Sequence, residues 1–166
     1  MPFKENWILD KIQTAFKDKR LAHAYLITGS TPETLEKLVE AMSECLLEMS
    51  PQHHSDYHCI RPESKSRRLT VAQIRELERE LHLKSREGGL KIGVVLSADR
   101  MCLGKAEPAN AFLKTLEEPP ENTVILMTTT RPSQLLPTII SRCIQLQLTD
   151  EGITEPGEEA QRWIRS

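Results

Sequence analysis

The turn at residues 28–36 is the place where this sequence would carry phosphate chemistry. Residues 24–28 are typical of a buried strand and a helical pattern follows, which is the setting of a phosphate-binding loop. Such a loop needs glycines that let backbone N–H groups approach the ligand, a lysine that neutralises it, and a Ser/Thr hydroxyl for Mg²⁺. Counted from Gly29, the lysine position holds Leu35 and the hydroxyl position holds Glu36. We therefore expect a degenerate loop that binds no nucleotide cofactor.

The second half of an ATPase site is an acidic strand end that holds Mg²⁺ and polarises the attacking water. Here the apolar run at 91–96 ends in Leu96 and Ser97, neither of which carries a charge. Asp99 follows two residues later and is predicted to be a helix N-cap or a surface charge. Both halves of a catalytic apparatus are therefore predicted to be missing, and no ATPase activity is expected.

Histidine and cysteine residues gather in the stretch 53–59, which raises the alternative of a metal site. The residues concerned are His53, His54, His58 and Cys59. Two adjacent histidines do not easily share one tetrahedral ion, and the spacing matches no common zinc pattern, so a polar loop is the favoured interpretation. The four cysteines of the chain form no Cys-x-x-Cys pair, which favours reduced packing residues over disulfides or zinc ligands.

Strand-like and helix-like segments alternate along the chain. Predicted strands cover residues 24–28, 57–60, 92–96, 123–127 and 144–148, the last of which is the final strand expected. Predicted helices contain residues 7–16, 32–49 and 109–116, and a fourth begins with the Thr70/Gln73 capping box and ends at Gly88-Gly89. Such alternation predicts an α/β, P-loop NTPase-like, three-layer domain with a mostly parallel sheet and helices on both faces. Ligand chemistry would lie at the carboxyl ends of the strands.

Bulk properties describe an ordinary globular chain. Its 166 residues are 39% hydrophobic and 28% charged, which suits one domain with its own core. The net charge of −2 excludes a strong chain-wide attraction to nucleic acid or anionic membranes, so any DNA contact must be local. No apolar run approaches the length that spans a bilayer and no signal peptide is recognisable, so a cytoplasmic location without membrane contact is expected.

Four motifs occur in a fixed order and carry a family resemblance. They are His-Ala-Tyr-Leu at 23–26, Ala-Asp-Arg-Met at 98–101, Asn-Ala-Phe-Leu-Lys-Thr-Leu-Glu-Glu-Pro-Pro at 110–120 and Ser-Arg-Cys at 141–143. Together they resemble the AAA+ clamp-loader subunits of bacterial DNA polymerase III. The resemblance runs from about Trp7 to Leu148, and the degenerate phosphate loop makes the chain similar to the delta prime type rather than to the ATP-hydrolysing gamma/tau type.

The resemblance implies a non-hydrolysing member of a five-membered ring that opens the sliding clamp and places it on primed DNA. Arg142, with Ser141 and Cys143 as its motif, would reach in trans to the ATP of an adjacent gamma/tau subunit. Partners would be the gamma/tau and delta subunits, and the whole would belong to the polymerase holoenzyme, a DNA-directed DNA polymerase. Two alternatives stay open: an ATP-hydrolysing gamma/tau-like subunit with an atypical phosphate loop, and an interaction module without a clamp-loader role.

Further residues are assigned candidate roles from their position in the sequence. Thr129 or Thr130 falls where the family's sensor residue sits, although without a nucleotide either one would simply cap the strand. Basic residues precede the third predicted helix, where side chains and the helix N-terminus could together contact a DNA phosphate. The candidates for DNA contact are Lys65, Arg67, Arg68 and Thr70.

The chain also departs from the family pattern. The four-cysteine zinc module usual before the second strand is absent, because Cys45 is followed within a few residues by His-Ser-Asp-Tyr at 54–57, so no metal is expected. About three extra residues lie between Met101 and Asn110, in a loop without an assigned role. Residues 1–150 are expected to form the clamp-loader N-terminal domain, and 151–166 a linker or the start of a lid domain. Without a collar domain, the chain alone is expected to be monomeric.

Overall fold

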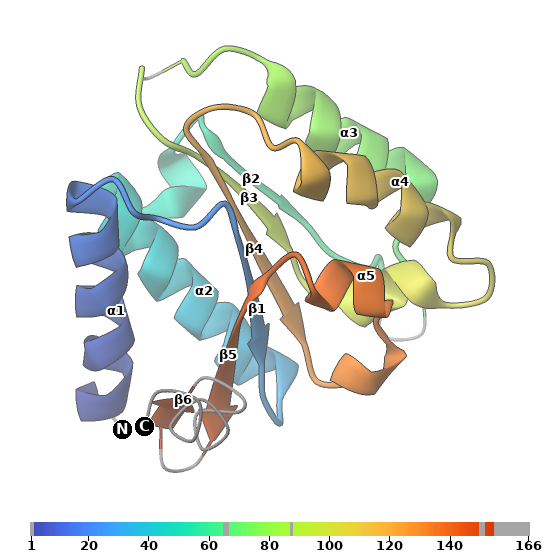
Figure 1. Ribbon diagram of the computed structural model, residues 1–166, viewed down its shortest axis with the longest axis horizontal. Helices are drawn as coiled ribbons and strands as arrows, with labels where there is room; N and C mark the ends of the chain where they lie inside the picture. The colour runs from blue at the N-terminus through green and yellow to red at the C-terminus, as the bar shows by residue number, and fades with distance from the viewer. Residues whose placement is uncertain (1, 65–66, 87, 150–151, 155–166) are drawn as a thin grey trace.

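A six-stranded sheet forms the centre of the computed structural model, which describes residues 2–64, 67–86, 88–149 and 152–154 (Figure 1). The strands are β1 (Ala24–Thr28), β2 (Tyr57–Ile60), β3 (Lys91–Val95), β4 (Thr123–Thr129), β5 (Ile144–Thr149) and β6 (Gly152–Thr154). Their order is β2-β3-β4-β1-β5-β6. The first five strands are parallel and β6 pairs antiparallel with β5, which confirms the predicted mostly parallel sheet.

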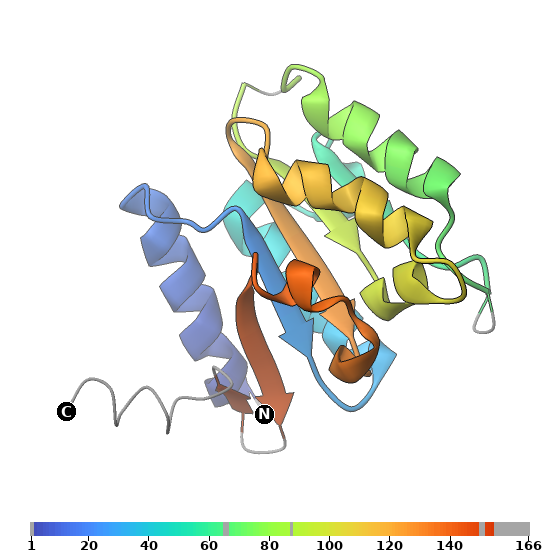
Figure 2. The same ribbon diagram turned by 45° about the vertical axis from the view of Figure 1, so that its right-hand side comes forward.

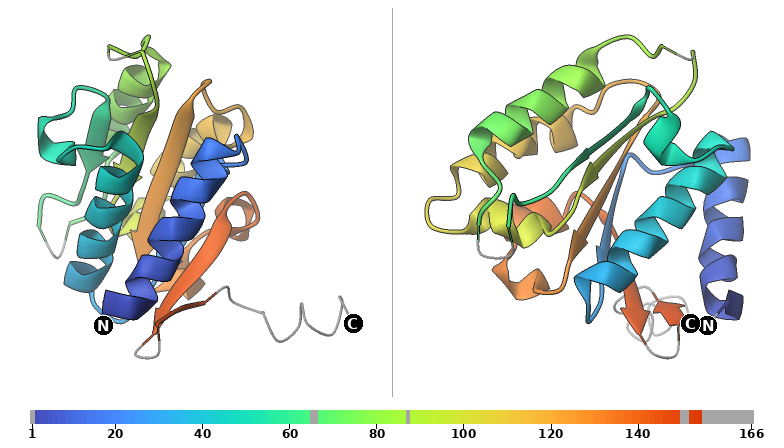
Figure 3. Two further views of the ribbon diagram at one scale, coloured as in Figure 1. Left: turned by 90° about the vertical axis from the view of Figure 1, so that its left-hand side faces the viewer. Right: turned by 180° about the vertical axis from the view of Figure 1, so that it is seen from behind.

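Helices cover both faces of the sheet, so the predicted three layers are confirmed (Figures 1 and 3). Among the described residues the α-helices are α1 (Pro2–Lys17), α2 (Pro32–Leu47), α3 (Val71–His82), α4 (Glu107–Glu117) and α5 (Pro137–Ile140). Helices α1 and α2 pack together on one face, while α3, α4 and α5 lie on the other (Figure 2). No helix among the described residues is long and apolar enough to cross a membrane.

Two cores follow from the alternation of side chains along each strand. In β1, Tyr25 and Ile27 point into the core beneath α1 and α2, whereas Ala24 and Leu26 point into the core beneath α3 and α4. Strands β3 and β4 divide in the same way. All residues of these three strands are buried, as expected for central strands covered on both sides.

Helix starts follow the local signals in the sequence. Thr31 is the N-cap of α2 and accepts a hydrogen bond from the Thr34 backbone N–H, while Pro32 occupies the first turn. The predicted capping box at α3 is confirmed, because the Thr70 hydroxyl accepts from the Gln73 N–H and the Gln73 side chain accepts from the Thr70 N–H. These caps place both helix N-termini near the carboxyl ends of the strands.

Three expectations about elements were wrong. The strand β6 follows β5, so the segment at 144–148 is not the last strand; a three-residue strand is too short to show a period in the sequence. Helix α3 ends at His82 rather than at Gly88-Gly89, because the Lys91 ammonium donates hydrogen bonds to the carbonyls of Glu80 and Leu83 at the C-terminus of the helix.

The third correction concerns α1. Ile8 and Ile12 are buried as predicted, but Trp7 and Phe16 are 44% and 40% exposed and lie outside the core. The helix therefore buries a narrower stripe than its apolar spacing suggests.

The domain division at residue 150 stays a prediction, although the sheet continues through β6 beyond that point. Most of the expected linker or lid segment, residues 155–166, lies outside the described residues.

Candidate functional site

The phosphate-loop position is filled by its own leucine. Gly29 follows β1, and Leu35 lies in the first turns of α2 with only 1% of its surface exposed. A Cβ built on Gly29 would come within 2.8 Å of Leu35 Cδ2, so the leucine side chain packs directly against the loop. The residue that should carry a positive charge to a phosphate instead belongs to the core under α1 and α2.

Glu36, at the position of the Mg²⁺-binding hydroxyl, is engaged by an arginine. Arg61 Nη2 lies 2.8 Å from Glu36 Oε1, which joins the segment after β2 to the second turn of α2. The pair is partly exposed, so its contribution to folding is small. Its chemical effect is nevertheless clear, because a carboxylate stands where a triphosphate would need a hydroxyl and a metal ion.

The ends of β3 and β4 are joined through threonine hydroxyls. The Ser97 backbone N–H donates to Thr128 Oγ1 at 3.1 Å, and Thr129 Oγ1 donates to Asp99 Oδ1 at 2.7 Å. Asp99 is 5% exposed and lies within the 3-10 helix Ala98–Cys102, so the prediction of an N-cap or a surface charge was wrong. The buried carboxylate is satisfied by a threonine that lies 30 residues away in the sequence, a contact that spacing alone does not reveal.

Of the two sensor candidates, Thr129 is the buried one. Its hydroxyl donates to Asp99 and also accepts from the Arg131 backbone N–H at 3.0 Å. Thr130 instead lines the open cleft at the carboxyl ends of the strands. Thr129 therefore acts as a structural link in this chain, and the role of Thr130 stays a prediction.

That cleft lies where a phosphate-binding loop would hold a nucleotide. It measures about 470 Å³ and is lined by side chains of both signs. The charged lining residues are Glu33, Glu36, Asp99, Arg61, Arg100 and Arg131. A triphosphate site concentrates positive charge and backbone donors, whereas this cleft balances three acidic against three basic residues. Leu96 and Ser97 are also in its wall, as the sequence predicted for the degenerate strand end.

Arg142 lies away from this cleft, beyond the end of α5. Its Nη1 donates to the Thr138 carbonyl at 2.7 Å and its Nη2 lies 2.8 Å from Glu117 Oε1. Its side chain is 33% exposed. The guanidinium is thus presented at the surface but held at two points.

The other two residues of the Ser-Arg-Cys motif fasten the turn that carries Arg142. Ser141 Oγ donates to the Thr138 carbonyl at 3.1 Å, and Cys143 Sγ donates to the Ile139 carbonyl at 3.2 Å. Burial raises the pKa of the Cys143 thiol to about 12, so it stays protonated at neutral pH. Neither side chain is prepared for nucleophilic chemistry, and both position the arginine between them.

The candidate DNA contacts lie in the segment before α3. Arg67 is exposed and forms an ion pair with Glu63 at 2.6 Å, and Arg68 is exposed beside Gly104 of the loop after the 3-10 helix. The Thr70 hydroxyl is used in the helix cap. Lys65 lies outside the described residues. A DNA contact through this segment stays a prediction.

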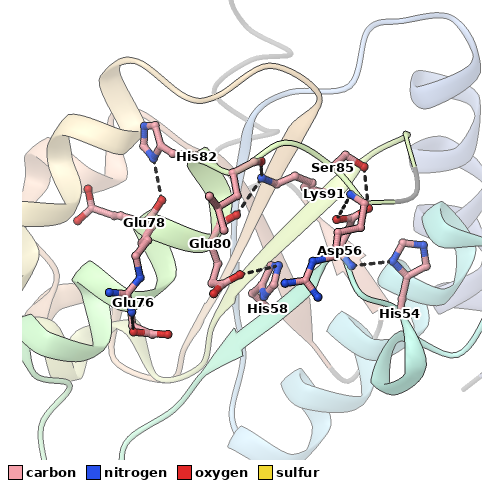
Figure 4. Close-up of polar contacts among 12 residues, drawn as sticks. His54, Asp56, His58, Glu76, Glu78, Glu80, His82, Ser85 and Lys91 are labelled. Atoms are coloured by element: carbon pink, nitrogen blue, oxygen red, sulfur yellow. Dashed lines mark hydrogen bonds and ion pairs between the residues drawn. The ribbon is translucent and has the colours of Figure 1, made fainter.

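The histidine and cysteine stretch does not converge into a metal centre in the described part of the chain. Figure 4 shows that His54 Nδ1 accepts from the Asp56 backbone N–H, while His58 Nε2 faces Glu80 of α3 at 3.9 Å. Asp56 itself is buried and accepts from Ser85 Oγ at 2.6 Å. The contacts of these residues hold the loop before β3 against the start of β2, so their role is structural.

One contact of Arg142 escaped sequence reasoning. Glu117 stands within the recognised motif at 110–120, yet nothing in its spacing indicated that it contacts Arg142, which is 25 residues away. The available signal was the position of a carboxylate at a helix C-terminus, where the helix dipole favours positive side chains.

The fold and this site together define a P-loop-type α/β domain whose nucleotide cradle is closed by apolar packing. Residues 4–152 match the family described as DNA polymerase III, delta subunit, and the chain belongs to this family. It is similar to the delta prime type of this family, because several of its relatives are named DNA polymerase III subunit delta'.

Among the curated relatives is DNA polymerase III subunit delta' of Pseudomonas aeruginosa, 34% identical over 75% of this chain and 42% of that protein. The delta' subunit of Escherichia coli is also 34% identical, over 81% of this chain and 44% of its own length. The chain thus spans less than half the length of these relatives. A solved structure of a DNA polymerase III gamma subunit-related protein from Thermotoga maritima superposes with a TM-score of 0.71 at 27% identity, covering 85% of this chain and 45% of that one.

Proposed function

We propose that this chain is a non-hydrolysing clamp-loader subunit that helps to load the sliding clamp onto primed DNA and supplies Arg142 in trans to the ATP of a neighbouring subunit. Its partners would be the gamma/tau and delta subunits and, through the assembled ring, the clamp and DNA. The single observation that carries the proposal is Leu35, which is buried in the position where a phosphate-binding lysine would stand.

The loss of nucleotide binding is supported by physical features that reinforce one another. Leu35 supplies no charge, Glu36 adds a negative one and Pro32 lacks a backbone donor. Rotating Leu35 away would leave a cavity in the core under α2, so the site does not open by a simple side-chain motion.

A role for Arg142 outside its own chain is supported by its location. Arg142 is not among the described residues that line the cleft at the strand ends, so it has no ligand to serve there. It remains one-third exposed at the end of α5. A guanidinium with free N–H donors at the surface suits bidentate contact with phosphate oxygens of another molecule.

Arg67 and Arg68 supply the proposed local DNA contact. Both are exposed and stand just before the N-terminus of α3, where the helix dipole adds to their charge. Because the whole chain has a net charge of −2, such contact would rest on these few residues.

Calorimetric titration of the chain with Mg-ATP tests the closed site directly. We expect no binding heat. Micromolar affinity would instead support the alternative of an ATP-hydrolysing subunit with an atypical phosphate loop.

The role of Arg142 is tested in a reconstituted clamp loader that contains the subunit as the cell makes it. Arginines that act in trans accelerate GTP hydrolysis by about 10³-fold to 10⁵-fold, but only one of several ATP sites in the ring would lose its partner. We therefore expect Arg142→Ala to cause a partial fall in DNA-stimulated ATP turnover and a larger fall in clamp loading. Arg142→Lys should fail nearly as badly, because lysine cannot make the bidentate contact. Unchanged rates with normal folding and assembly would refute the proposal.

A further inference from the structure

Two acceptors from different helices hold the Arg142 guanidinium. Glu117 is the last residue of α4, Thr138 belongs to α5, and Arg142 follows α5 by two residues. The contacts measure 2.8 Å to the Glu117 carboxylate and 2.7 Å to the Thr138 carbonyl. Helices α4 and α5 lie next to each other on the same face of the sheet (Figure 2). The arginine therefore takes its orientation from the junction of these two helices.

The position of Glu117 is unfavourable for the helix that carries it. A helix C-terminus carries partial negative charge and is stabilised by cations, yet α4 ends with Glu117 and is capped by Glu118. The ion pair is also partly exposed, with Glu117 at 49% and Arg142 at 33%, so it contributes little to folding. Neither the helix dipole nor global stability accounts for a carboxylate here, whereas orientation of the guanidinium does.

The pairing leaves the arginine able to bind an anion. A guanidinium has five N–H donors, of which the Glu117 and Thr138 contacts use two. Within the part of the chain that the structure describes, three donors remain for phosphate oxygens. Because arginine is long and flexible, fixing it beforehand reduces the entropy lost when it contacts a ligand.

We propose that Glu117 is a positioning residue, which presets the Arg142 guanidinium for contact with the triphosphate of the adjacent subunit. This inference rests on the proposed function. It adds that the Glu117 carboxylate acts through Arg142 alone and contributes to the rate rather than to ATP binding.

The first test measures the mobility of Arg142 in the isolated chain by NMR of its ¹⁵N-labelled guanidinium. In the wild type, rotation about the Nε–Cζ bond should be slow, and in Glu117→Ala it should become fast. Glu118→Ala is the matched control, because Glu118 is the exposed neighbour to which no side-chain ion pair is assigned within the described residues, and it should leave the rotation slow. Equal mobility in the wild type and in Glu117→Ala would overturn the positioning role.

The second test uses the reconstituted clamp loader with Glu117→Ala, Glu117→Gln, Glu118→Ala, Arg142→Ala and the Glu117→Ala/Arg142→Ala double variant. We expect Glu117→Ala to lower the kcat of DNA-stimulated turnover about twofold to fivefold with KM for ATP unchanged. Glu117→Gln keeps an acceptor in place and should recover part of the rate. The double variant should be no slower than Arg142→Ala, because Glu117 acts through the arginine.

The outcomes separate this inference from the proposed function. Loss of activity in Arg142→Ala, with Glu117→Ala behaving like Glu118→Ala, would overturn the positioning role alone. Additive losses in the double variant would also overturn it, because Glu117 would then act independently of the arginine. Unchanged activity in Arg142→Ala itself would overturn the proposed function, and the positioning role with it.

Discussion

Leu35 affects the phosphate loop through its volume as well as through its missing charge. Its side chain packs against Gly29 and lies in the core under α2, so the loop rests on apolar atoms. A lysine introduced at position 35 would bring its stem into the same apolar space. Restoring the sequence of a working loop at one position would therefore not restore its function.

The contact between Gly29 and Leu35 predicts the effect of adding a single methyl group. In Gly29→Ala the new Cβ would lie 2.8 Å from Leu35 Cδ2, so we expect a loss of stability of about 1–3 kcal/mol by chemical denaturation. Gly89→Ala is the control, since a Cβ there meets nothing within 4 Å. Leu35→Ala should remove most of the cost of Gly29→Ala, and simple additivity of the two changes would contradict this packing.

Cys143 should react slowly in the folded chain. Burial raises its pKa from the ordinary range of a thiol to about 12, and the thiolate is the reactive form, so little of it exists at neutral pH. We expect iodoacetamide to label Cys143 at least about tenfold more slowly at pH 7.5 than in urea, measured by peptide mass spectrometry. The folded rate should keep rising with pH, whereas a plateau near pH 9 would indicate an ordinary thiol.

At the scale of single residues, the sequence predicted which residue types are unsuited to ATP binding. It did not predict which partners the polar side chains would contact. Leu35 and Glu36 could be read from a count along one loop, which is local information. Asp99 and Glu117 acquire their partners 30 and 25 residues away, after the sheet and the helices have been assembled. Such contacts depend on register and packing and leave no local pattern.

The start and the end of helix α3 are determined by different kinds of contact. Its start is determined by the local sequence, since the Thr70/Gln73 capping box lies within four consecutive residues. Its end depends on a tertiary contact, because the Lys91 ammonium at the first position of β3 donates a hydrogen bond to the Glu80 carbonyl (Figure 4). This contrast explains why the predicted start was right and the predicted end was wrong.

Removing the cap should weaken α3. We expect Thr70→Ala to lower the free energy of unfolding by about 1 kcal/mol, because the Gln73 backbone N–H loses its acceptor. Thr70→Ser retains the hydroxyl and should stay close to the wild type. Equal unfolding midpoints for the alanine and serine variants would show that the cap contributes nothing.

The whole molecule carries 22 basic and 24 acidic residues, which leaves no large excess of charge to drive association. Its fold class was predictable because the strands at 24–28, 92–96 and 123–127 are buried on both faces and read as continuous apolar runs. We expect the isolated 166-residue chain to be monomeric in light scattering at micromolar concentration. A stable oligomer would contradict the expectation that further domains hold the clamp-loader ring together.

The short strand β6 has a consequence for the self-association of this chain. By pairing Gly152–Thr154 with residues 147–149 of β5, it satisfies backbone groups at an edge that would otherwise invite a strand from another molecule. A chain shortened after Thr149 would expose that edge while keeping all five parallel strands. We expect such a protein to remain folded yet to assemble by intermolecular strand addition, so that its light scattering rises with concentration. We therefore expect these three residues of backbone to limit aggregation.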